Sequence, residues 1–221
     1  MPKIGLIGGT GDIGSALALH LVKKNEVLLG SRSKEKAEAA IQGIMNEKRG
    51  RNDLNTRLKA VTNDYVSSSC DVVLLTVPCA VAIETVMALR DKFAGNQLLI
   101  SAVAAIKKSG KFFVPIQNAS SIAQSIQNIL PRTVTVASAF QTIPAKVLYN
   151  QETIDADVLV CCDDPDGYLR TADIVSSIQG LRPLYAGSLE TAAEIEGLTA
   201  VLLNVAINGH LKNPTLKIHS F

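Results

Sequence analysis

The first fourteen residues constrain the fold more than any other stretch. They read MPKIGLIGGTGDIG, so a short apolar run, Ile4 to Ile7, leads into glycines and then into apolar residues at helical spacing. G-x-G-x-x-G between a strand and a helix is the fingerprint of a dinucleotide-binding turn. Gly9 would make the tight turn, Gly11 would let the backbone approach a pyrophosphate, and Gly14 would let the helix pack on its strand. We expect the positive end of that helix to hold the phosphates.

Composition limits what can surround this motif. The 221 residues are 47% hydrophobic and 19% charged with a net charge of +2, so the chain can bury a large core. This balance argues against a broad nucleic-acid surface. The sequence shows neither a run of eighteen apolar residues nor a signal-peptide pattern. We expect a soluble, cytoplasmic protein without a membrane or nucleic-acid partner.

The cysteines and histidines do not have the spacing of metal ligands. None of the four cysteines forms a C-x-x-C pair, and His20, His210 and His219 are scattered. Cys161 and Cys162 fall in a predicted strand, where adjacent side chains point to opposite faces. We therefore expect packing cysteines and no metal site.

Strands and helices are predicted to alternate. The strands are 4–7, 26–30, 58–61, 71–77, 97–101, 133–137 and 157–162, and the helices are 16–22, 34–47, 80–93, 120–130, 165–179 and 189–208. Loops are expected at 48–53 and 104–118, with a short connection at 63–69. The pattern predicts an α/β fold, a doubly wound parallel sheet of the Rossmann-like, NADP-binding type, over 1–144. A smaller C-terminal α/β extension would follow over 145–221 and help to close the cofactor crevice.

The residues after the second strand indicate which dinucleotide is preferred. NAD(H) has a free ribose 2′-hydroxyl, which is usually bound by a carboxylate just after the second strand. The sequence has no carboxylate between Glu26 and Glu35. Arg32 can instead donate two hydrogen bonds to a 2′-phosphate. Ser31 lies beside it in the sequence, and Lys36 lies one helical turn further on. We expect NADP(H) rather than NAD(H).

The other strand ends offer apolar or small side chains. Thr76, Val77, Pro78 and Val103 would line the crevice where open α/β sheets bind ligands. The sequence contains no Tyr-x-x-x-Lys pair and no Ser-His-Asp candidate, and neither histidine nor lysine lies at these strand ends. Hydride transfer between two ring cofactors needs no such acid, because stacking supplies the geometry. We therefore name no catalytic side chain.

Five segments together resemble a known family. GGTGDIG at 8–14, GSRSKEKA at 30–37, TVP at 76–78, TIPA at 142–145 and GLRPL at 180–184 occur in the order found in the archaeal and actinobacterial NADPH:F420 oxidoreductases. The resemblance implies reversible hydride transfer between NADP(H) and the deazaflavin coenzyme F420, in which the protein supplies geometry and a water-poor slot.

The resemblance also implies residue roles. Thr10, Gly11, Asp12 and Ile13 would hold the pyrophosphate, and Ser31, Arg32 and Lys36 the 2′-phosphate. Val77, Val103 and Ala145 would border the nicotinamide. The deazaflavin would stack near Gln141 and Ile143, under the C-terminal helix around Leu203.

The chain departs from the family pattern at two positions, and alternatives stay open. Gln141 stands where a histidine is usual, and Cys79 where an aromatic residue is common; glutamine can hydrogen-bond a ring carbonyl but does not titrate near neutral pH. An NADPH-dependent reductase of a flavin, imine or carbonyl is one alternative, and a non-catalytic NADP-binding redox sensor is another. The last helix is expected to face something apolar with Val201 and Val205, either the nicotinamide crevice or a partner subunit, so a homodimer is possible.

Overall fold

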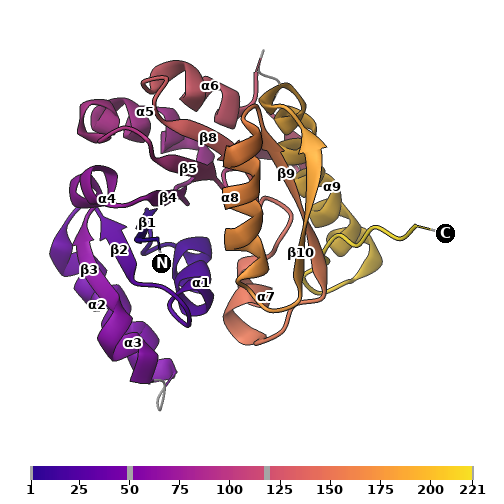
Figure 1. Cartoon of the computed structure of the whole chain (residues 1–221). Coiled ribbons are helices and arrows are strands. Elements are labelled where there is room, and N and C mark those ends of the chain that lie inside the picture. Colours follow the sequence, from indigo (N-terminus) through magenta and orange to yellow (C-terminus); the bar gives the residue numbers. More distant parts are fainter. Residues whose placement is uncertain (1, 49–51, 117–119, 221) are drawn as a thin grey trace.

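One twisted sheet forms the centre of the molecule. The computed structural model describes residues 2–48, 52–116 and 120–220. Eight strands make this sheet in the order β10-β9-β8-β5-β4-β1-β2-β3 (Figure 1). They are β1 (Ile4–Ile7), β2 (Val27–Ser31), β3 (Leu58–Thr62), β4 (Val72–Leu75), β5 (Leu98–Ser101), β8 (Thr135–Ser138), β9 (Ala156–Cys162) and β10 (Leu181–Gly187).

Helices cover both faces of the sheet, because its strands are apolar on both sides. One core cluster contains residues of α1 (Asp12–Leu21), α2 (Lys34–Glu47), α3 (Asn52–Arg57), α7 (Ala145–Asn150) and α8 (Pro165–Ser176). The other contains residues of α4 (Asn63–Ser69), α5 (Cys79–Leu89), α6 (Ile122–Ile129) and α9 (Ala192–Gly209), and short 3-10 turns lie at 90–92 and 189–191. Cys161 packs in the second cluster and Cys162 in the first, as the strand alternation predicts. The expected doubly wound α/β fold is confirmed.

The sheet changes direction once. The first six strands are parallel in the order β3-β2-β1-β4-β5-β8, but β9 runs antiparallel to β8, with Ser138 opposite Cys161. β10 then pairs parallel to β9, with α8 between them in the chain. The C-terminal residues thus extend the same sheet, and the division at residue 144 stays a prediction.

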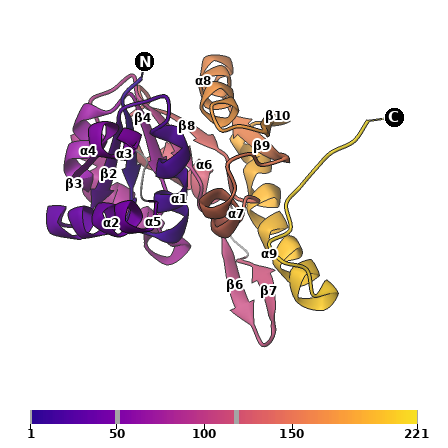
Figure 2. The same cartoon turned by 90° about the horizontal axis from the view of Figure 1, so that it is seen from below.

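Residues 104–118 contain a hairpin, where the sequence predicts an irregular loop. β6 (Ile106–Ser109) pairs antiparallel with β7 (Phe112–Pro115), and the hairpin projects from the body beside α9 (Figure 2). Asn204 of α9 fixes this arrangement, because its side chain accepts from Phe113 N at 2.8 Å and donates to Phe113 O at 2.7 Å. The prediction of a loop is wrong over both strands, and residues 117 and 118 lie outside the described residues.

Three short helices and one strand also differ from the expectations. α4 fills the predicted connection at 63–69, where Thr62 Oγ1 accepts from Tyr65 N at 3.4 Å and caps the helix. α7 follows Pro144, and α3 begins within the loop expected at 48–53, of which 49–51 lie outside the described residues. β10 was not predicted, since it contains a proline and a glycine; it lies at the sheet edge, where proline is tolerated.

The face of α9 that packs on the body of this chain is not the face that carries Val201 and Val205. Val201 and Val205 are 53% and 45% exposed, whereas Ile195, Glu196 and Ala200 are buried. The packed face of α9 therefore includes a charged residue, Glu196.

Candidate functional site

The glycine turn joins β1 to α1 and has the expected shape. Gly8 takes the left-handed conformation at φ +77°, and Gly9 N–H donates to Gly30 O at 2.9 Å. A Cβ on Gly9 would lie 2.9 Å from Leu29 Cγ, and one on Gly14 would lie 2.7 Å from Gly9 Cα. The positive φ of the turn thus belongs to Gly8, while Gly9 and Gly14 allow close packing.

Gly11 differs from these neighbours because the protein itself does not require a glycine there. Its φ of −79° and ψ of 170° suit any residue, and a Cβ would come no closer than 3.5 Å to a protein atom. Thr10, Gly11 and Asp12 are exposed at the start of α1, and the N-cap Gly11 has no side chain to occupy the helix N–H groups. The missing side chain leaves a cradle above a helix N-terminus, which suits a pyrophosphate.

The predicted 2′-phosphate residues lie at the end of β2 and in the first turn of α2. Ser31 is the last residue of β2 and is buried, whereas Arg32 and Lys36 are exposed. Ser33 caps α2, since its Oγ accepts from Lys36 N at 3.4 Å. Among the described residues, neither Arg32 nor Lys36 has an ion-pair partner, so both cations are available to an anion.

The carboxyl ends of four neighbouring strands lie along one sheet edge. The residue after each strand donates its backbone N–H to the last carbonyl of the neighbouring strand: Thr76 to Ile7, Ala102 to Leu75 and Ala139 to Ser101, at 3.0, 3.1 and 3.0 Å. A Cβ on Gly8 would lie 2.5 Å from Val77 Cγ1, so Val77 packs against the glycine turn. Val103 is 3% exposed, and Pro78 is the exposed N-cap of α5. These residues form an apolar rim next to the cradle.

Beyond β8 the chain enters a second part of the site. The buried Phe140 has a φ of +74°, which is rare for a bulky residue and turns the chain toward α9. Gln141 Nε2 donates to Ser101 O at 2.9 Å and to Ser138 Oγ at 2.7 Å. Gln141 Oε1 is the only buried side-chain oxygen or nitrogen without a partner in the described part of the chain. An unpartnered buried acceptor is costly unless a ligand or water satisfies it.

A cleft of about 520 Å³, here called the α9 cleft, opens beside Gln141. Its lining comes from the segment after β8, from α9 and from the C-terminal tail: Gln141, Thr142, Ile143, Pro144, Lys146, Thr199, Leu202, Leu203, Ala206, Leu211, Lys212, Asn213 and Pro214. An apolar cleft of this size with few polar groups is typical of small-molecule sites. The structure therefore brings the predicted Gln141, Ile143 and Leu203 together.

Ala145 lies in a neighbouring hollow instead. This hollow of about 380 Å³ lies between α1, α2 and α7 and includes Asp12 and Ser15 of the first helix. Lys146 lines both the hollow and the α9 cleft. Ala145 is thus next to the cleft rather than among its lining residues.

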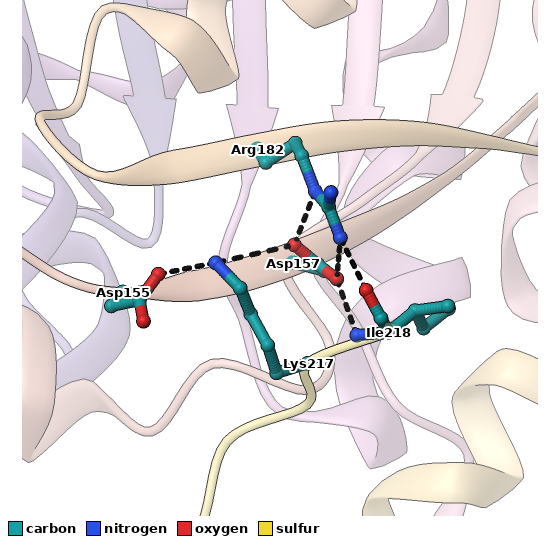
Figure 3. A network of polar contacts seen from close by, with 5 residues as sticks. All are labelled: Asp155, Asp157, Arg182, Lys217 and Ile218. Atoms are coloured by element: carbon teal, nitrogen blue, oxygen red, sulfur yellow. Dashed lines mark hydrogen bonds and ion pairs between the residues drawn. The ribbon is translucent and has the colours of Figure 1, made fainter. Parts of the chain in front are cut away.

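The C-terminal tail is held in place by a polar network, here called the C-terminal lock (Figure 3). Its centre is Asp157, whose side chain is fully buried and accepts from Arg182 Nε at 2.8 Å and Nη2 at 2.7 Å. Ile218 N also donates to Asp157 at 2.6 Å, and Ile218 O accepts from Arg182 at 2.6 Å. Lys217 pairs with Asp155. The Arg182 hydrogen bonds lower the pKa of Asp157, and the lock anchors the tail just beyond its cleft-lining residues.

Glu196 is a further residue at this edge that the sequence analysis did not single out. It is 1% exposed, and its carboxylate accepts from Ile122 N at 2.9 Å and Ala123 N at 3.3 Å, as well as from the Ala105 backbone. Burial raises the pKa of Glu196 to about 7, although these backbone hydrogen bonds lower it. A carboxylate at helical spacing from Ala192, Ala200 and Leu203 is the signal that could have identified it.

No group of three or more His, Cys, Asp and Glu side chains within residues 2–48, 52–116 and 120–220 is arranged to hold a metal ion. Across the same ranges, no helix has the length and apolar character needed to span a membrane.

Comparisons with known proteins agree with this geometry. The family model described as "NADP oxidoreductase coenzyme F420-dependent" matches residues 3–105. The F420-dependent NADP reductase of Methanothermobacter thermautotrophicus is 34% identical over 98% of this chain and 94% of its own length. The chain belongs to the F420-dependent NADP reductase family. The enzyme of the same name from Methanocaldococcus jannaschii is 32% identical over 98% of this chain and 97% of its own.

Members of the family are oxidoreductases. A comparison with solved structures shows the fold. A crystal structure of a candidate F420-dependent NADP reductase from Arthrobacter sp. FB24 matches with a TM-score of 0.81 at 19% identity, over all of both chains. The expected family and fold are thus confirmed. The roles of single residues stay predictions.

Proposed function

We propose that this chain transfers hydride reversibly between NADP(H) and coenzyme F420. One observation carries the proposal: a phosphate cradle at Gly11 and the apolar α9 cleft lie at the same edge of one sheet, joined by the ends of β4, β5 and β8. Such an arrangement suits two ring cofactors that meet between the cradle and the cleft. Membership of the F420-dependent NADP reductase family supports the same substrates.

The proposed donor site follows the sheet edge. Thr10, Gly11, Asp12 and Ile13 hold the pyrophosphate through backbone N–H groups, on a turn shaped by Gly9 and Gly14. Ser31, Arg32 and Lys36 hold the 2′-phosphate. Thr76, Val77, Pro78, Val103 and Ala145 border the nicotinamide and exclude water from it.

The proposed acceptor site is the α9 cleft. Ile143 and Leu203 offer apolar contact to the faces of the deazaflavin, and Gln141 Oε1 accepts a hydrogen bond from a ring N–H. NADPH would supply a hydride from its nicotinamide ring and leave as NADP⁺, and the deazaflavin ring would accept that hydride together with one proton from solvent. The protein orients both rings and keeps the space between them dry, and no side chain moves a proton. Lys146 and Lys212 are the titratable side chains that line the cleft among the described residues.

Mixing the protein with NADPH and oxidised F420, and following the loss of F420 absorbance, tests the reaction. Reduction should be observed with NADPH and be much slower with NADH. Cofactor binding without reduction of F420 at millimolar NADPH would reject the proposal. Reduction of a flavin or an imine, but not of F420, would favour another reductase.

Arg32→Ala tests the donor site. Loss of a charge-assisted contact with the 2′-phosphate should raise the Kd for NADP about tenfold or more, while the Kd for NAD changes little. Lys34→Ala, which removes a cation that pairs with Glu38 on the same helix, is the matched control. An unchanged preference for NADP in Arg32→Ala contradicts the assignment.

We also propose that the chain acts as a cytoplasmic homodimer. Val201 and Val205 lie one helical turn apart on α9 and are both exposed, which supports self-association. The four cysteines are unpaired, which suits a reducing compartment, and the net charge of +2 gives no support to nucleic-acid binding. Light scattering at micromolar concentration tests the dimer, and a mass near 23.5 kDa would reject it.

A further inference from the structure

Glu196 joins the two sides of the proposed crevice. On the donor side it accepts hydrogen bonds from the Ala105 backbone, two residues after Val103, and from the first turn of α6 through Ile122 N and Ala123 N. On the acceptor side it belongs to α9, whose later residues line the α9 cleft. The carboxylate therefore links two segments that are far apart in sequence.

The packed face of α9 extends this link toward the cleft. Residues three, four and seven positions after Glu196 lie on the same face of a helix, and they are Thr199, Ala200 and Leu203. Thr199 Oγ1 donates to Gln141 O at 2.9 Å, and Leu203 lines the cleft. A shift of Glu196 relative to α6 would thus move Leu203 relative to the segment after β8.

The protonation state of Glu196 affects this link, because its hydrogen-bond partners among the described residues are all backbone N–H donors. A carboxylate accepts from all three backbone N–H groups, whereas a protonated carboxyl would direct its own O–H at one of them and lose that contact. Among the described residues, the charge of Glu196 affects the thiols of Cys79 in α5 and Cys161 in β9. Burial is the main cause that raises the pKa of each thiol, and the negative charge of Glu196 raises it further. No cation among the described residues is paired with Glu196.

We propose that Glu196 is a positioning residue for hydride transfer: its ionised carboxylate holds α9, and with it the deazaflavin, at the correct distance from the nicotinamide side of the crevice. The inference rests on the proposed function. It predicts that loss of a proton from Glu196 tightens the crevice and raises the rate of transfer.

The first test needs no cofactor. In the wild-type protein, the NMR shifts of the amide protons of Ala105, Ile122 and Ala123 should titrate together between pH 5 and 9, with a midpoint near 7. Glu196→Gln should abolish that titration, whereas Glu194→Gln, an exposed change on the same helix, should keep it. Amide shifts that do not change with pH in the wild type overturn the proposal, and so does an unchanged titration in Glu196→Gln. The first of these outcomes needs no variant at all.

The second test uses the complete reaction. Glu196→Gln resembles the protonated acid, so the ratio of its kcat to the wild-type kcat should be near one at pH 5.5. This ratio should fall about fivefold by pH 8.5, as expected for the loss of one charge-assisted hydrogen bond. Taking the ratio cancels any titration of the coenzymes themselves. The KM for NADPH should change less than about twofold, because the phosphate cradle is not involved.

The two tests separate the possible failures. A kcat ratio that does not change with pH, while the wild type turns over, overturns the positioning role of Glu196. Absence of any wild-type turnover, with the amide titration intact, overturns the proposed function instead.

Discussion

Two buried carboxylates hold the C-terminal third of the molecule, and they do so in opposite ways. Asp157 in the C-terminal lock has a bidentate guanidinium partner, and its pKa is lowered (Figure 3). Among the described residues, Glu196 at the α9–α6 junction accepts hydrogen bonds from backbone N–H groups alone, and burial raises its pKa to about 7. Burial alone therefore does not decide the charge of an acid, because the partner does.

The difference gives the two sites opposite effects on stability as the pH changes. Asp157 binds a proton less readily in the folded state, so its contribution is present above pH about 4 and is lost as the pH falls below that value. Glu196 binds a proton more readily in the folded state. Its effect is most favourable below pH about 4.5, declines as the pH rises, and levels off above pH about 7.

Replacing Arg182, the more exposed partner of the ion pair in the C-terminal lock, should have the largest effect on stability. Arg182→Met leaves the Asp157 charge buried without its main partner, which should lower the free energy of unfolding at pH 7 by about 3 to 4 kcal/mol. Urea denaturation measures the change. Arg132→Met, at an exposed arginine outside the lock, should alter stability by less than about 0.5 kcal/mol. A similar small loss in Arg182→Met would show that water solvates Asp157.

The titration of Glu196 should have the next largest effect. The free energy of unfolding of Glu196→Gln minus that of the wild type should increase by about 2 to 3 kcal/mol between pH 5 and pH 8. The reason is that the wild type must bury a charge at the higher pH and the variant has none. Chemical denaturation at closely spaced pH values gives both curves, with Glu194→Gln as the control. If the two curves run parallel, Glu196 does not titrate in this range.

Removing the buried partner of the lock should cost less than removing the exposed one. Asp157→Asn keeps the shape of the side chain, and the half-exposed Arg182 is then solvated by water, so the expected loss is about 1 to 2 kcal/mol. The same change in the Arg182→Met background should be neutral or stabilising, since it removes the unpaired charge. A double-mutant cycle measures this coupling, and strictly additive losses would contradict it.

The smallest effect is expected at the rim of the lock. Lys217→Met removes the pair with Asp155, whose side chain is 84% exposed, so the free energy of unfolding should fall by less than about 1 kcal/mol. A larger loss would mean that the 3.9 Å contact of Lys217 with Asp157 contributes to the lock.

The sequence predicted the parts of the molecule whose signals are local. Alternating apolar runs and helical periodicity indicated the parallel core, and the glycine pattern located the cradle at Gly11 and the close contact at Gly14. Ser31 and Arg32 were placed at the end of β2 for the same reason, and Lys36 was placed one helical turn further on.

Features that depend on distant partners were not predictable in this way. The β6–β7 hairpin contains lysines on its first strand, and β10 contains Pro183, so neither resembles a buried strand. β9 runs antiparallel to β8, and the composition of a strand does not show in which direction it will pair. Glu196 and Asp157 obtain their roles from Ile122 and Arg182, which are 74 and 25 positions away. The sequence shows each residue but not its partner.

Gly11 also has a consequence for how this chain tolerates mutation. Its neighbours leave room for a methyl group, so Gly11→Ala should fold normally while placing that methyl group where a phosphate would lie. Most inactivating substitutions in a glycine turn also reduce the amount of folded protein, which confuses loss of binding with loss of expression. This position offers a separation-of-function allele: a normal level of intact protein that lacks the cofactor.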